Sequence, residues 1–237
     1  MVTVFSPHLD DAVLSAATRL MRAPVRVVNV FAGAPPPRVE VTAWERLTRA
    51  RSSAERHRER LAEDREAMAF LGCTAVYLDL PEKEHREAAV GDLCERLRPF
   101  VETRDEIWVP AGIGGHPDHV ATRDAVLAAR AGAAGHAEVM LYADLPYAVR
   151  YGWPSWVAGT AALEFLDPDA WLNGELTTRG LDPAQLTPSV VTLDTELRAK
   201  KERAVQAYRT QLAALGLGPA HRDSWKTFLG YELAWRM

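Results

Sequence analysis

Short apolar segments alternate with helix-forming segments through the first 145 residues of this 237-residue chain. Because a helix that links two parallel strands returns the chain to the same end of a sheet, this alternation predicts a mostly parallel sheet with right-handed crossovers. The fold class is therefore α/β and Rossmann-like, with helices on both faces of the sheet. The predicted strands are residues 2–5, 25–31, 75–80, 106–110 and 139–143.

The segments between and after these strands carry helical periodicity. We predict helices at residues 11–21, 42–71 (one long helix or a pair), 87–102, 117–131 and 196–215. Two further strands are predicted at 190–193 and 227–235. Residues 151–190 have little periodicity and contain Trp153, Trp156 and Trp171 among prolines and glycines. We therefore expect one domain, residues 1–237, with 151–190 as an insertion or lid.

Composition excludes several classes of protein. The formal net charge of −4 argues against nucleic-acid binding, which requires a basic surface. No basic segment followed by an apolar one begins the chain, and no run of 18 apolar residues occurs, so neither a signal peptide nor a membrane span is expected. The two cysteines, Cys73 and Cys94, belong to no CxxC pair and are interpreted as buried free thiols. These features favour a cytoplasmic protein. Oligomeric state has no signature in the sequence.

Two polar clusters follow predicted strands. Ser-Pro-His-Leu-Asp-Asp at 6–11 follows the first strand, and His-Pro-Asp-His at 116–119 follows the fourth. In open α/β sheets ligands bind at the carboxyl ends of the strands, where the strand order reverses. The common order 3-2-1-4-5 places strand 1 beside strand 4, so both clusters should meet in one crevice. His and Asp side chains bind zinc or ferrous iron, which indicates a metal hydrolase.

Spacing within the clusters separates ligands from other groups. His8 and Asp11 lie three residues apart across a strand-to-helix turn, and His119 lies one helical turn after His116. A catalytic zinc ion needs about three protein ligands and an open position. His8, Asp11 and His119 would supply that set, leaving Asp10 and His116 for proton transfer and charge stabilisation. The competing interpretation is that the aspartates, Asp118 included, merely cap helices.

Both clusters resemble the motifs of the PIG-L/LmbE family of zinc-dependent de-N-acetylases. The family's (A/P)HPDDE motif is similar to Pro-His-Leu-Asp-Asp-Ala at 7–12, and its HPDH-type motif to Gly-His-Pro-Asp-His at 115–119. The likeness extends over roughly residues 2–148. It implies zinc, with ferrous iron as the alternative metal, and removal of an N-acetyl group from an amino sugar or an amino-sugar-bearing small molecule.

The resemblance also implies roles for individual residues. His8, Asp11 and His119 match the family's metal ligands, and Asp10 matches its general base. His116 matches the histidine that stabilises the oxyanion or protonates the leaving amine, and Asp118 the carboxylate that tunes that histidine. The expected partner is a small N-acetylated sugar.

Three positions depart from the family pattern. Leu9 replaces a proline and Ala12 replaces a glutamate, but neither position supplies a ligand or the base. Gly114 stands where some thiol-sugar deacetylases of the family carry a tyrosine. If that tyrosine assists catalysis in those relatives, another group must do so here.

Substrate contacts are expected from four residues. Asp79 ends the third strand, Arg60 lies on the long helix, Tyr142 ends the fifth strand, and Trp153 could stack on a sugar face or simply pack within the lid. The remaining histidines lie among charged or small residues and are interpreted as surface groups. They are His57, His85, His136 and His221.

Other functions remain open at this stage. A Mg²⁺-dependent phosphohydrolase could use Asp10 and Asp11, although the neighbouring histidines disfavour magnesium. The enzyme could instead be a zinc amidase that cleaves a longer amide, such as a thiol-sugar conjugate. A non-catalytic carbohydrate-binding protein on the same scaffold would need no base such as Asp10.

Overall fold

A seven-stranded mixed sheet forms the centre of the molecule. The structure, a computed structural model, describes residues 1–22, 24–37, 40–102, 106–133, 137–160, 165–218 and 221–237. The strand order is β3-β2-β1-β4-β5-β7-β6, so the predicted order 3-2-1-4-5 is confirmed. The strands are β1 (Val2–Ser6), β2 (Val25–Asn29), β3 (Thr74–Tyr77), β4 (Glu106–Pro110), β5 (Glu138–Tyr142), β6 (Thr187–Thr192) and β7 (Tyr231–Arg236).

The first five strands are parallel, and the last two add an antiparallel edge. β1 is buried along its whole length, as expected for a central parallel strand covered on both faces. Its register pairs Ser6 with Asn29 of β2 and Val4 with Trp108 of β4. β7 pairs antiparallel with both β5 and β6. The carboxyl ends of β1 and β4 consequently lie side by side.

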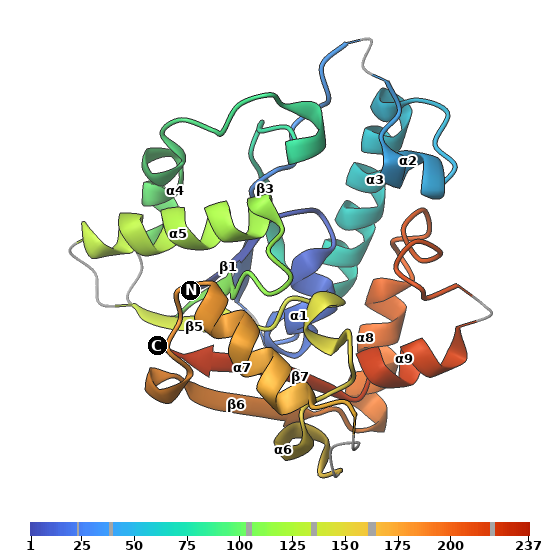
Figure 1. Ribbon diagram of the computed structural model, residues 1–237. Coiled ribbons are helices and arrows are strands. Elements are labelled where there is room, and N and C mark those ends of the chain that lie inside the picture. Colours follow the sequence, from blue (N-terminus) through green and yellow to red (C-terminus); the bar gives the residue numbers. More distant parts are fainter. Residues whose placement is uncertain (23, 38–39, 103–105, 134–136, 161–164, 219–220) are drawn as a thin grey trace.

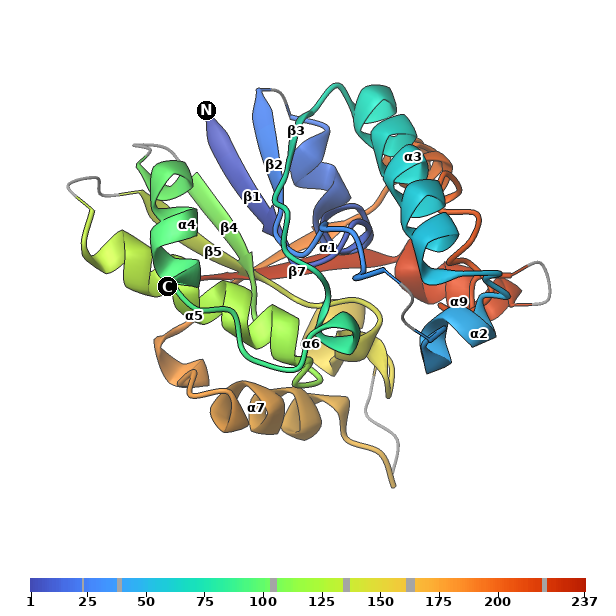
Figure 2. The ribbon, with the colours of Figure 1, turned by 90° about the horizontal axis from the view of Figure 1, so that it is seen from above.

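Helices cover both faces of this sheet, as predicted (Figure 1). Figure 2 shows α4 and α5 on one side of the strands and α1 and α3 on the other. α8 packs against α1 and α3. The helices of this layer arrangement are α1 (Asp11–Leu20), α2 (Ala43–Leu47), α3 (Ser53–Leu71), α4 (Leu93–Val101), α5 (Pro117–Ala131), α8 (Thr195–Val205) and α9 (Arg222–Phe228).

Three predicted boundaries were wrong by about four residues or more. α4 begins at Leu93 rather than at residue 87, because Asp92 adopts a left-handed backbone (φ 56°) that ends any helix reaching it from Glu87. α8 ends at Val205 rather than at 215. Beyond it, both the backbone N–H and the hydroxyl of Thr210 donate to Glu63, an arrangement that a continued helix would not offer. The predicted last strand, 227–235, starts only at β7, since residues 227 and 228 end α9.

The predicted lid segment contains two helices, which contact each other. Its elements within the described ranges are α6 (Ser155–Ala158), α7 (Pro168–Thr178), the short 3-10 helix η3 (Pro183–Gln185) and the start of β6. α7 contacts the loop between β4 and α5: Gly114 donates its backbone N–H to Glu175 (2.8 Å). The segment is therefore connected to the loop that leads into His116.

Two smaller expectations can be compared with the structure. Cys73 and Cys94 are free thiols, but they are half-buried rather than buried. Within the described ranges, no helix combines the length and the apolar character needed to cross a lipid bilayer.

Candidate metal centre

A tight turn after β1 presents His8 and Asp11. The backbone N–H of His8 donates to Asp11 (2.8 Å), and the N–H of Ala12 donates to the Ser6 hydroxyl (2.9 Å). These bonds close the turn from strand to helix and aim both side chains at the carboxyl end of the sheet. His8 is therefore positioned by backbone geometry that Ser6 and Asp11 themselves stabilise.

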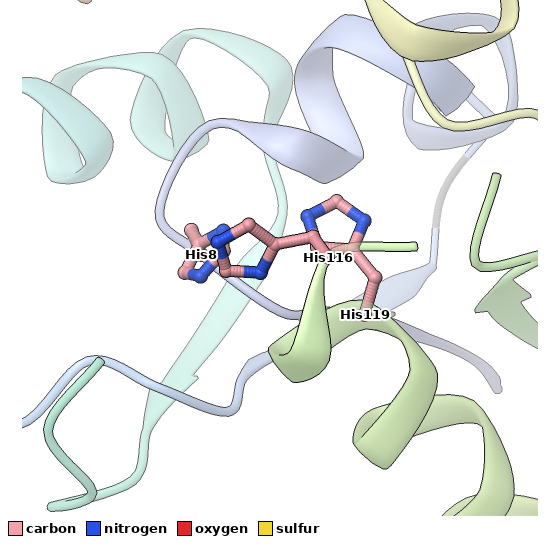
Figure 3. Close-up of side chains that lie close together, drawn as sticks. All are labelled: His8, His116 and His119. Atoms are coloured by element: carbon pink, nitrogen blue, oxygen red, sulfur yellow. The ribbon is translucent and has the colours of Figure 1, made fainter. Parts of the chain in front are cut away.

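The start of α5 presents His116 and His119. His116 is the N-cap residue and Pro117 the first helical residue, a position that suits a residue without a backbone N–H. Figure 3 shows the rings of His8, His116 and His119 gathered at one point, with two of them on α5. One ring nitrogen from each lies within 4.8 Å of the others. The predicted meeting of the two clusters is thus observed.

One oxygen of Asp11 lies between two of these rings. Asp11 Oδ2 is 3.2 Å from His8 Nδ1 and 3.2 Å from His119 Nε2. The opposite nitrogens face other carboxylates: His8 Nε2 lies 3.0 Å from Asp118, and His119 Nδ1 lies 2.7 Å from Asp144. A metal-binding histidine commonly donates its second N–H to a carboxylate in this way. The donor set of His8, Asp11 and His119 therefore fits a divalent cation.

The electrostatics of the cluster favour a bound cation. Burial alone would lower the pKa of His8, but hydrogen bonds to Asp11 and Asp118 raise it well above its usual value. Burial likewise opposes the charge on His119, yet the charge of Asp11 and bonds to Asp11 and Asp144 raise its pKa to about 9. Surrounding carboxylates thus hold positive charge in this buried position, either as protons or as a cation that replaces them.

His116 belongs to the same histidine group but is oriented differently. Its Nδ1 accepts the backbone N–H of Asp118 (3.2 Å), so its proton resides on Nε2. That Nε2 faces Glu84 (3.5 Å), whose pKa this contact lowers to about 2. Spacing alone would admit His116 as a ligand in place of Asp11, but the Asp11 oxygen lies between the other two rings. We therefore keep Asp11 in the proposed ligand set.

Asp10 lines the same pocket without serving as a helix cap. It occupies the N-cap position of α1, yet its side chain makes no capping hydrogen bond. Burial, together with the charge of Asp11, raises its pKa. The pKa of Asp11 moves the other way: burial opposes its charge, but the contacts with His119 and His8 lower its pKa well below the usual range. Two adjacent carboxylates thus differ in basicity, as a ligand and a base should.

Asp118 contacts a different histidine from the one expected. Its buried carboxylate bonds to His8, to the backbone N–H of Lys83 (2.9 Å) and to the guanidinium of Arg86. Burial opposes its charge, but these partners lower its pKa to about 2. The expected tuning of His116 by the Asp118 side chain is not seen, because that carboxylate points back toward the β1 turn. Its contacts also rule out a simple capping role.

A cavity of about 280 Å³ opens onto these residues, a volume that suits a small ligand. Of the four predicted substrate contacts, the structure brings only Arg60 into its wall, where Arg60 pairs with Glu82 (2.6 Å). Tyr142 is fully buried and donates its hydroxyl to the Phe5 carbonyl (2.8 Å). Trp153 donates its indole N–H to the carbonyl of Thr227 in α9 (2.8 Å), and Asp79 is exposed outside the pocket.

Several pocket residues were missed from the sequence. His85 was expected at the surface, but it lines the pocket and lies 3.4 Å from Glu45. Trp44 also lines the pocket and donates its indole N–H to Gln211 (2.7 Å), a residue 167 positions away. Neither belongs to a motif, so only tertiary contacts could reveal them. His57 is half-buried, His221 is exposed, and His136 lies outside the described residues.

The ring of Tyr147 lies against the backbone of Gly114. Gly114 has a left-handed backbone (φ 83°), and a Cβ placed there would lie 2.6 Å from Cγ of Tyr147. Tyr147 follows β5 in the short 3-10 helix η2 (Tyr147–Val149) and lines the pocket. The tyrosine ring thus occupies the space beside Gly114 that a side chain at that position would need.

Comparisons with known proteins agree with this geometry. The model of the PIG-L family, described as GlcNAc-PI de-N-acetylase, matches residues 3–130. A deacetylase of the teicoplanin biosynthetic pathway shares 27% identity and a TM-score of 0.74, covering 99% of this chain and 96% of its own. The A40926 pseudoaglycone deacetylase shares 28% identity and a TM-score of 0.67, covering 99% and 95%.

A more distant structure shares only the fold. The N,N′-diacetylchitobiose deacetylase from Pyrococcus horikoshii has 17% identity and a TM-score of 0.53, covering 98% of this chain and 82% of its own. The comparison with curated proteins gave no significant match.

Proposed function

Because the chain belongs to the PIG-L family and is an amino-sugar de-N-acetylase, we propose that it uses zinc bound by His8, Asp11 and His119. The observation that carries this proposal is the shared Asp11 oxygen, 3.2 Å from a nitrogen of each ring. Nitrogen and oxygen donors of this kind suit zinc, and ferrous iron is the alternative. Bound zinc would lower the pKa of a water molecule and polarise the amide carbonyl.

The chain's own residues then divide the remaining work. Asp10 lies in the pocket with a raised pKa and no capping bond, which suits a general base that takes up the proton of water. His116, which also lines the pocket, carries its proton on Nε2, and this N–H can stabilise charge on the carbonyl oxygen. Asp10 then passes the proton that it took from water to the departing amine. The products are acetate and a free amino sugar.

The outer carboxylates orient the ligands in this proposal. Asp118 would hold the His8 ring and Asp144 the His119 ring, each by a bond to the nitrogen that faces away from Asp11. Arg86 in turn bonds to Asp118 and stacks over Phe31, with its guanidinium carbon 4.4 Å from the ring centroid. Asp118 thus supports the His8 ring directly, and Arg86 supports Asp118.

The residues that line the pocket indicate the kind of substrate. Arg60, Glu45 and His85 offer polar groups suited to sugar hydroxyls, whereas Trp44 and Leu215 offer apolar surface. The relatives named above are described as a deacetylase of the teicoplanin biosynthetic pathway and a deacetylase of the pseudoaglycone of the antimicrobial A40926. We propose that the substrate is a small molecule in which an N-acetylated amino sugar is attached to an apolar group.

The test combines metal analysis with product analysis. The purified protein should contain about one equivalent of zinc or iron, and it should release acetate from N-acetylated amino sugars. A panel of free sugars, sugars bearing aromatic groups and longer N-acyl analogues would define the substrate. Metal-loaded protein that releases no acid from any member of the panel would contradict the proposed reaction. Preference for long acyl chains would favour the broader amidase.

A further inference from the structure

Tyr147 lies in the pocket because two residues of the segment after β5, Asp144 and Leu145, form hydrogen bonds to the site. Asp144 bonds to His119 Nδ1 (2.7 Å) and accepts the backbone N–H of Ile113 (2.9 Å). Leu145 donates its backbone N–H to the hydroxyl of Ser15 on α1 (3.0 Å). The segment that carries Tyr147 is therefore connected to the His119 ring, to the loop before His116 and to α1.

The ring of Tyr147 is itself packed on two sides. It lies against Gly114, where a Cβ would come within 2.6 Å of its Cγ, and it meets the His119 ring edge-on with centroids 5.7 Å apart. A ring held between a glycine and a buried imidazole has little freedom to rotate away. Its position relative to the reacting group is consequently set before substrate binds.

The hydroxyl of Tyr147 has no hydrogen-bond partner among the residues that the structure describes. The hydroxyls of Tyr77, Tyr142, Tyr208 and Tyr231 all donate to protein oxygens. A half-buried phenol without a partner in a ligand-sized cavity is therefore a donor available to a ligand.

The surroundings of this phenol indicate which ligand atom it serves. Asp10, Asp11, Glu82 and Glu84 also line the pocket and give it negative charge. An oxygen that gains negative charge during the reaction would be repelled there unless neutral or positive donors faced it. A tyrosine is neutral near pH 7 and donates a hydrogen bond without giving up its proton.

We propose that Tyr147 is a catalytic residue whose hydroxyl donates a hydrogen bond to the carbonyl oxygen of the scissile amide. The bond strengthens as that oxygen gains charge, so it contributes to turnover more than to substrate binding. This inference rests on the proposed de-N-acetylation. Gly114 has a part in it, since only a residue without a Cβ leaves room for the ring.

The direct experiment replaces Tyr147 with phenylalanine, which keeps the ring and removes the donor. With an N-acetylated amino sugar that the wild type hydrolyses, kcat should fall about 10²-fold, as for loss of one oxyanion donor. KM should stay within about threefold, because uniform binding is unaffected. Metal content and thermal unfolding should match the wild type. An unchanged kcat, or a rise in KM alone, would overturn the proposal.

A second substrate gives a readout that a structural role would not produce. An N-trifluoroacetyl sugar stabilises the oxyanion by itself, so the kcat loss in Tyr147→Phe should be smaller with it than with the N-acetyl sugar. Equal losses with both substrates would contradict oxyanion stabilisation. Tyr151→Phe is the matched control, because Tyr151 packs edge-on against Trp171, 5.4 Å between centroids, outside the pocket.

Gly114→Ala tests the packing. When Gly114→Ala is the only substitution, the new Cβ must displace the Tyr147 ring, so kcat should fall. When it is added to Tyr147→Ala, no ring is left to displace, so kcat should fall little further. An equal fall in kcat on both backgrounds would mean that Gly114→Ala acts by straining the left-handed backbone at residue 114. That result would contradict the idea that the Cβ acts by displacing the Tyr147 ring. The proposed function fails separately: a wild-type protein without deacetylase activity contradicts that function, whereas an active wild type with an equally active Tyr147→Phe variant contradicts only the role of Tyr147.

Discussion

Replacing Asp144 with asparagine should weaken metal binding while the fold is retained. Asp144 follows β5 and is fully buried. One of its oxygens lies 2.7 Å from His119 Nδ1, and the other accepts the Ile113 N–H at 2.9 Å. Asparagine has nearly the same shape but only one oxygen. If that oxygen keeps the Ile113 bond, the amide NH₂ must face His119.

The expected loss follows from the proton on that ring. With a carboxylate opposite, Nδ1 carries the proton and Nε2 is free to bind a cation. With an NH₂ group opposite, Nδ1 must accept, and the proton moves to Nε2, the atom that faces Asp11. Loss of such an outer partner costs about 10–100-fold in metal affinity, or about 1.4–2.7 kcal/mol. This range agrees with the contribution of a hydrogen bond to a charged group, which is about 1.5–3 kcal/mol.

Competition between the metal-free protein and a chromogenic chelator would measure the zinc dissociation constant of both forms. Asp223→Asn is the matched control, because Asp223 is 95% exposed and pairs with Lys226 on α9. The control should bind zinc as the wild type does, and thermal unfolding should report any loss of fold. An unchanged zinc affinity in Asp144→Asn would refute the idea that an anionic partner sets the His119 ring.

Three further predictions concern the base, a ligand and a buried acid. Asp10→Asn should keep its zinc but lose about 10²–10⁴-fold in kcat, as expected for a general base; full activity would exclude Asp10 from that role. His119→Ala should lose zinc by elemental analysis, whereas His57→Ala, outside the pocket, should keep it; equal stoichiometry would remove His119 from the ligands. Burial raises the pKa of Asp64 to about 7 despite a bond from Tyr208. The folded chain therefore binds more protons than the unfolded chain between about pH 4 and 7, so stability falls as pH rises through this window, by up to about 4 kcal/mol. Urea unfolding across this range should show a smaller decline in Asp64→Asn; an equal decline would contradict the assignment.

The central part of the fold was predictable because its signals are local. Runs of buried β-branched residues and intervening amphipathic segments predicted all five parallel strands, and the order of the sheet followed from general topology. The largest error occurred where a long-range contact opposes the local signal. The helix after residue 195 ends early because Glu63 takes the N–H and hydroxyl of Thr210.

Some residues of the candidate site could likewise be predicted from local sequence, and others could not. His8 and His119 could be found because motif spacing and strand ends identify them. The Asp144 partner of His119, the tie between Trp44 and Gln211, and the pocket position of His85 depend on residues that lie far apart in the chain. No periodicity encodes such pairs, since each depends on how loops from different strands meet.

The sequence alone determined the reaction chemistry of this protein: residues 6–11 and 116–119 bring histidines and carboxylates to the ends of two strands that any sheet of this order makes neighbours. Tertiary structure decided the environment of that chemistry. It assigned Asp118 to His8 rather than to His116, buried Tyr142 and brought Tyr147 beside Gly114. Strand ends are fixed by local propensity and topology, whereas side-chain contacts depend on the packing of loops that have no local signature.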